Sequence, residues 1–139
     1  MTLIRDIMTR GVETIARDAT LQEAAARMRA LDVGVLPVCD GPALAGMVTD
    51  RDIAVRGVAE GMVPQESRVA DVMTEDVRWC AEDETVESVL EEMGDQQVRR
   101  LAVLNAAREV VGIVTLGDLA TREPKVHTDE ALREISSPD

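Results

Sequence analysis

The chain contains an internal repeat, and no other feature constrains its fold as strongly. Residues near the N-terminus recur 65 positions later, and the offset becomes 66 after one inserted residue. The matching pairs include Asp6 and Asp71, Met8 and Met73, Thr9 and Thr74, Thr20 and Thr85, Gly46 and Gly112, Thr49 and Thr115, and Asp52 and Asp118. Two copies of one small unit predict a pseudo-symmetric fold with a ligand cleft between the halves.

The length of 139 residues is enough for one compact domain, whereas each half alone would be marginal at roughly 60 residues. We therefore expect the halves to share a core. With one Trp and neither Phe nor Tyr, that core must be aliphatic. The repeat predicts a first motif over residues 1–62, a second over 63–123, and a tail over 124–139.

Apolar spacing and turn residues predict the order strand, helix, strand, strand, helix in each copy. In the first copy the expected elements are a strand at 12–16, a helix at 21–31, strands at 33–39 and 44–48, and a helix at 49–60 that stops at Gly61. In the second copy they are a strand at 77–81, a helix at 86–93, strands at 98–104 and 110–114, and a helix from 115. The expected fold class is α/β (α+β), with two β-α-β-β-α motifs packed by pseudo-two-fold symmetry.

Charge and composition disfavour several classes of function. The formal net charge of −12 repels nucleic acid and anionic membranes. No apolar run approaches the roughly 18–20 residues of a membrane span, and the N-terminus lacks a signal-peptide core, so we expect a cytoplasmic protein. Cys39, Cys80 and the one histidine, His127, are too few for a disulfide framework or a zinc site. We expect no metal and no catalytic residues, because no nucleophile is paired with a base.

The repeated motifs resemble CBS motifs, named for cystathionine β-synthase. One copy is carried by Asp6-Ile7-Met8-Thr9, Leu36-Pro37-Val38 and Gly46-Met47-Val48-Thr49-Asp50-Arg51-Asp52. The other is carried by Asp71-Val72-Met73-Thr74, Val98-Arg99-Arg100-Leu101-Ala102-Val103 and Gly112-Ile113-Val114-Thr115-Leu116-Gly117-Asp118. The resemblance covers about residues 3–122, and it is closest to bacterial stand-alone CBS-pair proteins, including the hypoxia-response type. The chain departs from the pattern at Ala102, where the first copy has Pro37.

The resemblance implies a CBS pair, or Bateman module, that binds AMP, ADP, ATP or S-adenosylmethionine as a regulatory ligand, as in energy sensing. It implies no required cofactor, a homodimer formed through the CBS helices, and a protein effector of unknown identity. Carried over by motif, the first nucleotide site comprises Met47, Thr49, Arg51, Asp52, Val77, Arg78, Trp79, Val98, Arg99 and Arg100. The second comprises Val12, Glu13, Val33, Gly34, Val35, Ile113, Thr115 and Asp118, with Arg122 one turn later.

General chemistry supports these roles but leaves alternatives open. A carboxylate accepts hydrogen bonds from ribose hydroxyls, a helix N-terminus favours phosphate, and arginine forks match phosphate oxygens. The two Thr-x-x-Asp sequences are also variants of the helix capping box, and both roles can coexist. Phosphate binding is the favoured role of Arg99 and Arg100, and the alternatives are a solvated strand edge or partners for the many carboxylates. Trp79 could be core filler rather than a neighbour of adenine.

Two other functions compete with the nucleotide sensor. One is a structural dimerisation module without a ligand, and the other is a nucleic-acid-binding CBS protein, which the acidic balance makes the less favoured. If ligands bind, the two sites should be unequal. The site with Asp52 should be tighter for phosphorylated ligands, because the motif assignment gives it the arginines.

Overall fold

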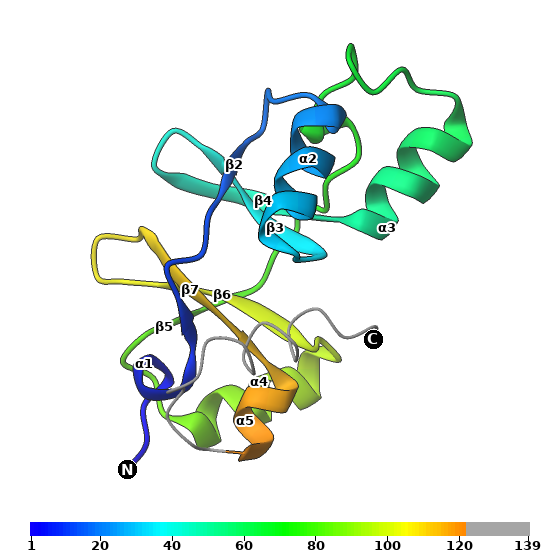
Figure 1. Cartoon of the computed structure of the whole chain (residues 1–139). Helices are drawn as coiled ribbons and strands as arrows, with labels where there is room; N and C mark the ends of the chain where they lie inside the picture. Colours follow the sequence, from blue (N-terminus) through cyan, green and yellow to red (C-terminus); the bar gives the residue numbers. More distant parts are fainter. Residues whose placement is uncertain (122–139) are drawn as a thin grey trace. The chain divides into compact units, whose positions relative to one another are not determined.

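The computed structural model describes residues 1–121, and the chain divides into two compact units (Figure 1). The first unit is Glu13–Val77. The second unit combines Met1–Val12 with the chain from Arg78 onward. The units thus divide the chain at positions other than the repeat boundaries expected after residues 62 and 123.

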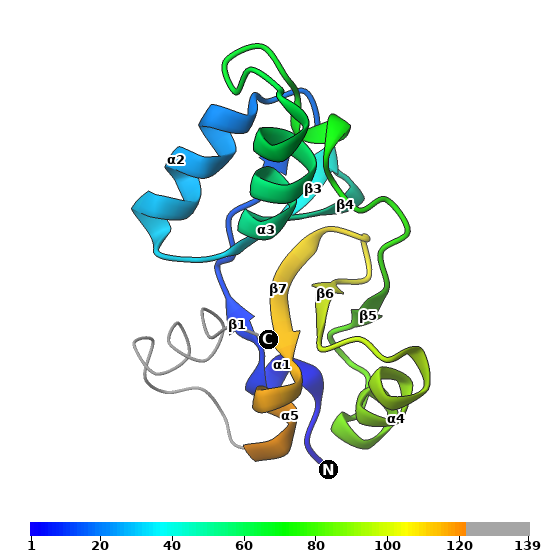
Figure 2. The same ribbon diagram turned by 90° about the vertical axis from the view of Figure 1, so that its right-hand side faces the viewer.

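The first unit contains a three-stranded sheet in the order β2-β3-β4. Its elements are β2 (Ile15–Ala16), α2 (Leu21–Leu31), β3 (Val35–Asp40), β4 (Ala43–Thr49), α3 (Asp50–Asp52), the π-helix η1 (Ile53–Gly57), and the 3₁₀-helices η2 (Val58–Glu60) and η3 (Val69–Asp71). Strand β2 pairs with β3 in parallel, and β3 forms an antiparallel hairpin with β4. Figure 2 shows α2 beside the helical segment that begins with α3.

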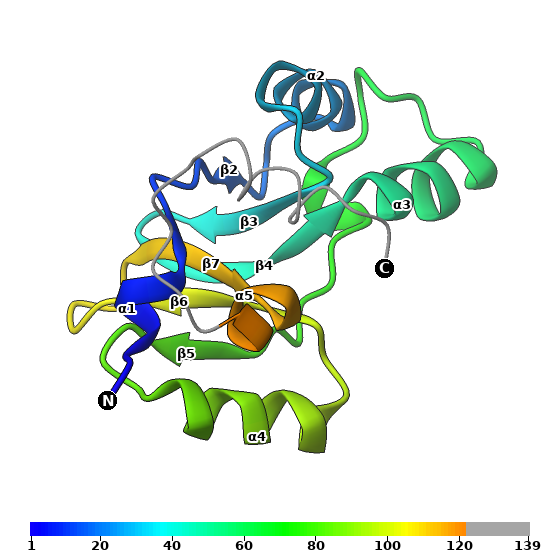
Figure 3. The ribbon, with the colours of Figure 1, turned by 60° about the horizontal axis from the view of Figure 1, so that its bottom comes forward.

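The second unit contains a four-stranded sheet in the order β1-β7-β6-β5. Its elements are α1 (Ile4–Ile7), β1 (Thr9–Arg10), β5 (Trp79–Ala81), α4 (Val86–Gln96), β6 (Arg100–Leu104), β7 (Val110–Thr115) and α5 (Leu116–Thr121). As in the first unit, β5 and β6 are parallel and β6 and β7 are antiparallel. Figure 3 shows α4 running alongside the sheet at the β5 edge.

The repeats exchange their leading Met-Thr segments. Thr9 pairs with Ile113 of the second repeat, whereas Thr74 pairs with Met47 of the first. Two glycines make this close approach possible. A Cβ on Gly112 would lie 2.6 Å from the Thr9 carbonyl oxygen, and one on Gly46 would lie 2.5 Å from that of Thr74. Each unit is therefore completed by a segment that the sequence pattern assigns to the other copy.

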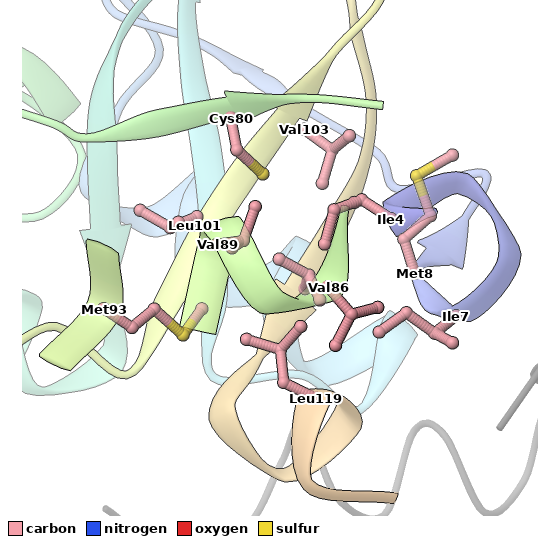
Figure 4. Close-up of a cluster of buried hydrophobic side chains, with 11 residues drawn as sticks. Ile4, Ile7, Met8, Cys80, Val86, Val89, Met93, Leu101, Val103 and Leu119 are labelled. Atoms are coloured by element: carbon pink, nitrogen blue, oxygen red, sulfur yellow. The ribbon is translucent and has the colours of Figure 1, made fainter. Parts of the chain in front are cut away.

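The described residues form two aliphatic cores, one in each unit, and not the single core expected. Each core nevertheless takes side chains from both halves of the sequence, as expected. Figure 4 shows the cluster of the second unit, where α1, α4, α5 and the sheet contribute side chains. Its fully buried members include Ile4, Ile7, Val86, Val89, Leu101 and Leu119. The first unit has a separate cluster that includes Leu21, Leu36, Val38, Val48 and Val69. The exchanged segments account for this sharing, because Ile4 and Ile7 enter one core while Val69 and Val72 enter the other.

The expected order of elements is confirmed, with shifts at their ends. The strands expected at 12–16 and 77–81 are reduced to β2 and β5. Helix α4 runs three residues beyond its expected end at residue 93, and Gln97 terminates it in the left-handed conformation. The helical segment from residue 50 to 60 ends at Gly61 as expected, with φ of 79°. It is not one regular α-helix, because Ile53–Gly57 is a π-helix.

Candidate functional site

Both Thr-x-x-Asp sequences form reciprocal capping boxes. In the first repeat the Thr49 hydroxyl accepts the Asp52 N–H at 3.0 Å, and Asp52 Oδ2 accepts the Thr49 N–H at 3.0 Å. In the second repeat the corresponding distances between Thr115 and Asp118 are 3.1 and 2.8 Å. The capping interpretation is therefore confirmed for both copies. A cap already uses one oxygen of each aspartate, so any ligand must use what remains.

The two aspartates differ in exposure. The Asp52 side chain is 14% exposed, whereas Asp118 is 0% exposed and Thr115 is 8% exposed. Asp52 also has a charged neighbour, because its Oδ1 lies 3.9 Å from Nε of Arg56. The sequence analysis did not single out Arg56, although its spacing of four residues from Asp52 on a helix was the available signal.

In each repeat the first strand of the hairpin, β3 or β6, begins beside the helix start of the same repeat. The Gly34 carbonyl accepts the Asp50 N–H at 3.0 Å, and Val35 is the register partner of Thr49. In the second unit the Arg99 carbonyl accepts the Leu116 N–H at 2.8 Å. These neighbourhoods lie within one repeat, whereas the motif assignment grouped the same strands with the helix of the other repeat.

Arg99 and Arg100 thus accompany the second helix start and not the first. Arg100 is the register partner of Thr115, and Arg99 is the residue directly before β6. At the equivalent positions the first repeat has Gly34 and Val35. The grouping of Arg99 and Arg100 with Asp52 concerns two different units, and it stays a prediction.

The other expected site residues fall at the margins of the sheets. Exposed positions are Glu13, Arg51, Arg78 and Arg99; half-buried positions are Val12, Val33, Gly34, Val77, Val98 and Arg100; buried positions are Val35, Met47 and Ile113. Arg122 and His127 lie outside the described residues. Side chains available to a ligand are therefore concentrated at strand ends and helix starts.

Trp79 is a surface residue and not core filler. It lies on β5, an edge strand, with 39% of its surface exposed. The guanidinium carbon of Arg108 lies 5.4 Å from the centroid of its ring, a cation–π distance. Sequence reasoning missed Arg108, because it lies in the hairpin turn between β6 and β7 and no pattern ties it to Trp79.

The two thiols are held in their neutral form. Burial, with the charges of Glu84 and Glu92, raises the pKa of Cys80 from its ordinary 9.0 to about 12. Burial also raises the pKa of Cys39, and a hydrogen bond with Thr14 partly offsets this. Among residues 1–121, no group of three or more His, Cys, Asp or Glu is placed to hold a metal ion. Over the same range, no helix is long and apolar enough to cross a membrane.

Comparison with known proteins decides the family. The CBS domain model matches residues 4–57 and 69–125, which is both repeats. The chain belongs to the CBS domain family. Its similarity to solved CBS structures and the two repeated motifs identify the fold as a CBS pair, in agreement with the α+β class expected from the sequence.

Among its bacterial relatives, the chain is 37% identical to Hypoxic response protein 1 of Mycobacterium tuberculosis, over 99% of this chain and 96% of the relative. It is 39% identical to the protein YlbB of Bacillus subtilis, over 100% and 95%. The expected resemblance to the hypoxia-response type is confirmed.

Two solved structures are informative neighbours. Hypoxic Response Protein I, solved with two coordinated zinc ions, has a TM-score of 0.75 and 38% identity, and the match covers 87% of this chain and 98% of that one. The CBS domain pair of protein MJ0100, solved with 5′-methylthioadenosine and S-adenosyl-L-methionine, has a TM-score of 0.72 and 29% identity, with coverage of 87% and 94%. Each ligand is a property of the protein in which it was found.

Proposed function

We propose that this CBS pair is a non-catalytic regulatory module that binds an adenosine-containing ligand. The ligands named for protein MJ0100 support this class, since both are adenosine derivatives and that pair matches nearly the whole described chain. AMP, ADP, ATP and S-adenosylmethionine are the candidates. In this proposal the ligand acts as a regulator, and no further cofactor is required.

One observation carries the proposal: Asp52 is a partly exposed carboxylate at a helix start. The side chain is 14% exposed; its Oδ2 is used by the capping box, and its Oδ1 lies beside Arg56. A carboxylate oxygen in this position can accept hydrogen bonds from ribose hydroxyls, and such bonds to a charged acceptor are strong. The positive end of the helix dipole at the same helix start favours a phosphate nearby.

The proposed ligand contacts follow the motif assignment. In the first site Thr49 and Asp52 bind ribose and phosphate, and Arg99 and Arg100 serve the phosphate. In the second site Thr115 and Asp118 take the equivalent roles. The buried state of Asp118 makes the second site the weaker candidate, because its carboxylate would have to become accessible first.

A ligand-free dimerisation module is the second candidate. Three valines on and after the irregular helical segment favour it, because Val55, Val58 and Val63 are 48%, 61% and 48% exposed. Exposed aliphatic side chains close together are typical of a surface that a partner covers. We propose a homodimer in either case, and the two candidates differ in whether a ligand binds.

Isothermal titration of the full chain with adenosine, AMP, ADP, ATP and S-adenosylmethionine tests the proposal. At least one should bind, and Asp52→Ala should weaken it by about 1–3 kcal/mol because a charged acceptor is lost. Asp40→Ala is the matched control: it removes an exposed carboxylate at the end of β3 in the same unit and should leave affinity unchanged. A folded, dimeric wild type that binds none of the five would establish the ligand-free module instead.

A further inference from the structure

The Asp52 carboxylate belongs to a longer chain of contacts within the first unit. Arg56 lies beside Asp52 on one side, with Nε 3.9 Å from Oδ1. On the other side, its Nη1 donates a hydrogen bond to the Val72 carbonyl at 3.3 Å. One guanidinium therefore joins the candidate ribose acceptor to a segment sixteen residues farther along the chain.

The segment reached by Arg56 leads back to the same helix start. Val72 precedes Met73 and Thr74, and Thr74 exchanges two backbone hydrogen bonds with Met47, at 3.0 and 2.9 Å. Met47 lies two residues before the Thr49 cap on β4. The contacts thus close a ring from the cap through Asp52, Arg56 and the exchanged Met-Thr segment back to the cap.

Local structure explains why Arg56 can span this distance. It lies in η1, where π-type i→i+5 hydrogen bonds change the direction of the side chains relative to an α-helix. Gly57 fixes the packing of this turn, since a Cβ there would lie 2.9 Å from a methyl group of Leu21. The π-turn is thus held in place by the core of its own unit, and Arg56 is held with it.

We propose that Arg56 is a positioning residue for ligand binding: it orients the Asp52 carboxylate and couples its occupancy to the exchanged Met-Thr segment. The proposal rests on the proposed function of Asp52. Coupling is reciprocal, so a ligand that depends on this orientation should in turn stabilise the Met47–Thr74 pairing. The ligand then acts on a segment that the first unit receives from the second repeat.

The test compares Arg56→Gln and Arg56→Lys with Arg29→Gln, which removes an exposed arginine of α2 in the same unit. Adenosine and AMP are titrated into each. Arg56→Gln should weaken both ligands by the same factor, roughly twofold to fivefold, the range of a partly exposed ion pair. Arg56→Lys should recover part of the loss, and Arg29→Gln should change neither affinity.

A double-mutant cycle distinguishes positioning of Asp52 from a purely structural role, because only positioning makes the effects of the two substitutions on affinity depend on each other. In an Asp52→Asn background, Arg56→Gln should have no further effect on affinity, because the two residues act as one unit. Hydrogen exchange at the Met47 and Thr74 amides should speed up in Arg56→Gln and slow down when ligand binds the wild type.

Four results would overturn the inference. A loss confined to AMP would make Arg56 a phosphate ligand. Unchanged affinity with lower thermal stability would make it structural, and additive effects with Asp52→Asn would make it independent. A wild type that binds neither adenosine nor AMP would instead remove the proposed function on which the inference rests.

Discussion

The two helix starts have the same hydrogen bonds and different surroundings. Thr49 and Asp52 form their box at a charged, partly exposed surface next to Arg56, whereas Thr115 and Asp118 form the same box inside the protein. Repetition of a motif therefore conserves the local cap but not its access to solvent. A Thr-x-x-Asp pattern alone cannot tell a ligand group from a structural cap, and exposure is what separates them.

The repeats also differ in how charge is distributed around this box. Leu116 and Gly117 occupy the positions that Asp50 and Arg51 occupy in the first repeat. The first helix start is thus densely charged, whereas the cations beside the second are Arg99 and Arg100, at the start of β6. The two copies thus differ in the charges beside a pair of capping residues that stays identical.

The largest losses of stability are expected at two glycines that occupy equivalent positions in the two units. Gly46→Ala and Gly112→Ala should each cost about 2–3 kcal/mol of unfolding free energy, because the new Cβ meets a backbone carbonyl at 2.5 or 2.6 Å. Gly94→Ala is the control, since nothing lies within 4 Å of its Cβ position on α4, and it should be neutral or stabilising. Urea denaturation measures all three, and a tolerated Gly46→Ala would show that the Thr74 segment moves freely.

The second prediction compares the stability that Asp52 and Asp118 each contribute. Asp118→Asn should lower the free energy of unfolding by about 1–3 kcal/mol, because a fully buried charged acceptor of the Thr115 N–H is lost. Asp52→Asn should cost less than about 1 kcal/mol, since water can reach its partly exposed site. Equal losses for both variants in thermal or urea unfolding would mean that burial does not distinguish the repeats.

Sequence reasoning recovered the features that depend on local patterns. Apolar spacing located both helices α2 and α4, and the Gly41 turn located the first hairpin. The exchange of Met8-Thr9 with Met73-Thr74 could not be predicted, because both copies carry the same motif and either pairing satisfies it. Arg56 and Arg108 escaped because their partners, Val72 and Trp79, are distant in sequence and share no periodicity with them.

The third prediction compares how the two thiols contribute to the loss of stability at alkaline pH. The pKa of Cys80 is raised to about 12 in the folded protein, so the unfolded chain loses this proton first. Stability should therefore be intact below pH 9 and fall above it, by up to about 1.4 kcal/mol per pH unit. With no Tyr and with Lys125 as the only lysine, few other groups titrate in this range.

Cys80→Ala should remove most of this alkaline loss, and Cys39→Ala should remove less, because Cys39 is only partly buried. The comparison uses the slope of unfolding free energy between pH 8 and 10, so the constant cost of each substitution cancels. Parallel slopes for wild type and Cys80→Ala would contradict the assignment of the alkaline loss to Cys80.

The smallest change in stability is expected at the two hairpin turns. They share one backbone conformation, but a different residue type adopts it in each turn. Gly41 has φ of 62° in the first hairpin, and Arg108 has φ of 64° in the second. A positive φ costs little for glycine and is unfavourable for arginine. The second hairpin offsets this cost through Asn105, whose side-chain oxygen accepts the N–H groups of Ala107 and Glu109, and through the contact of Arg108 with Trp79.

Arg108→Gly should therefore change stability by less than about 1 kcal/mol, because relief of the backbone offsets the lost cation–π contact. Its effect should appear in the fluorescence of Trp79, the only tryptophan, as stronger quenching by acrylamide. Arg108→Lys keeps the cation and should quench like the wild type. If Arg108→Gly leaves quenching unchanged, the arginine does not shield the ring in solution, and Trp79 would be as open to a planar ligand as its edge-strand position allows.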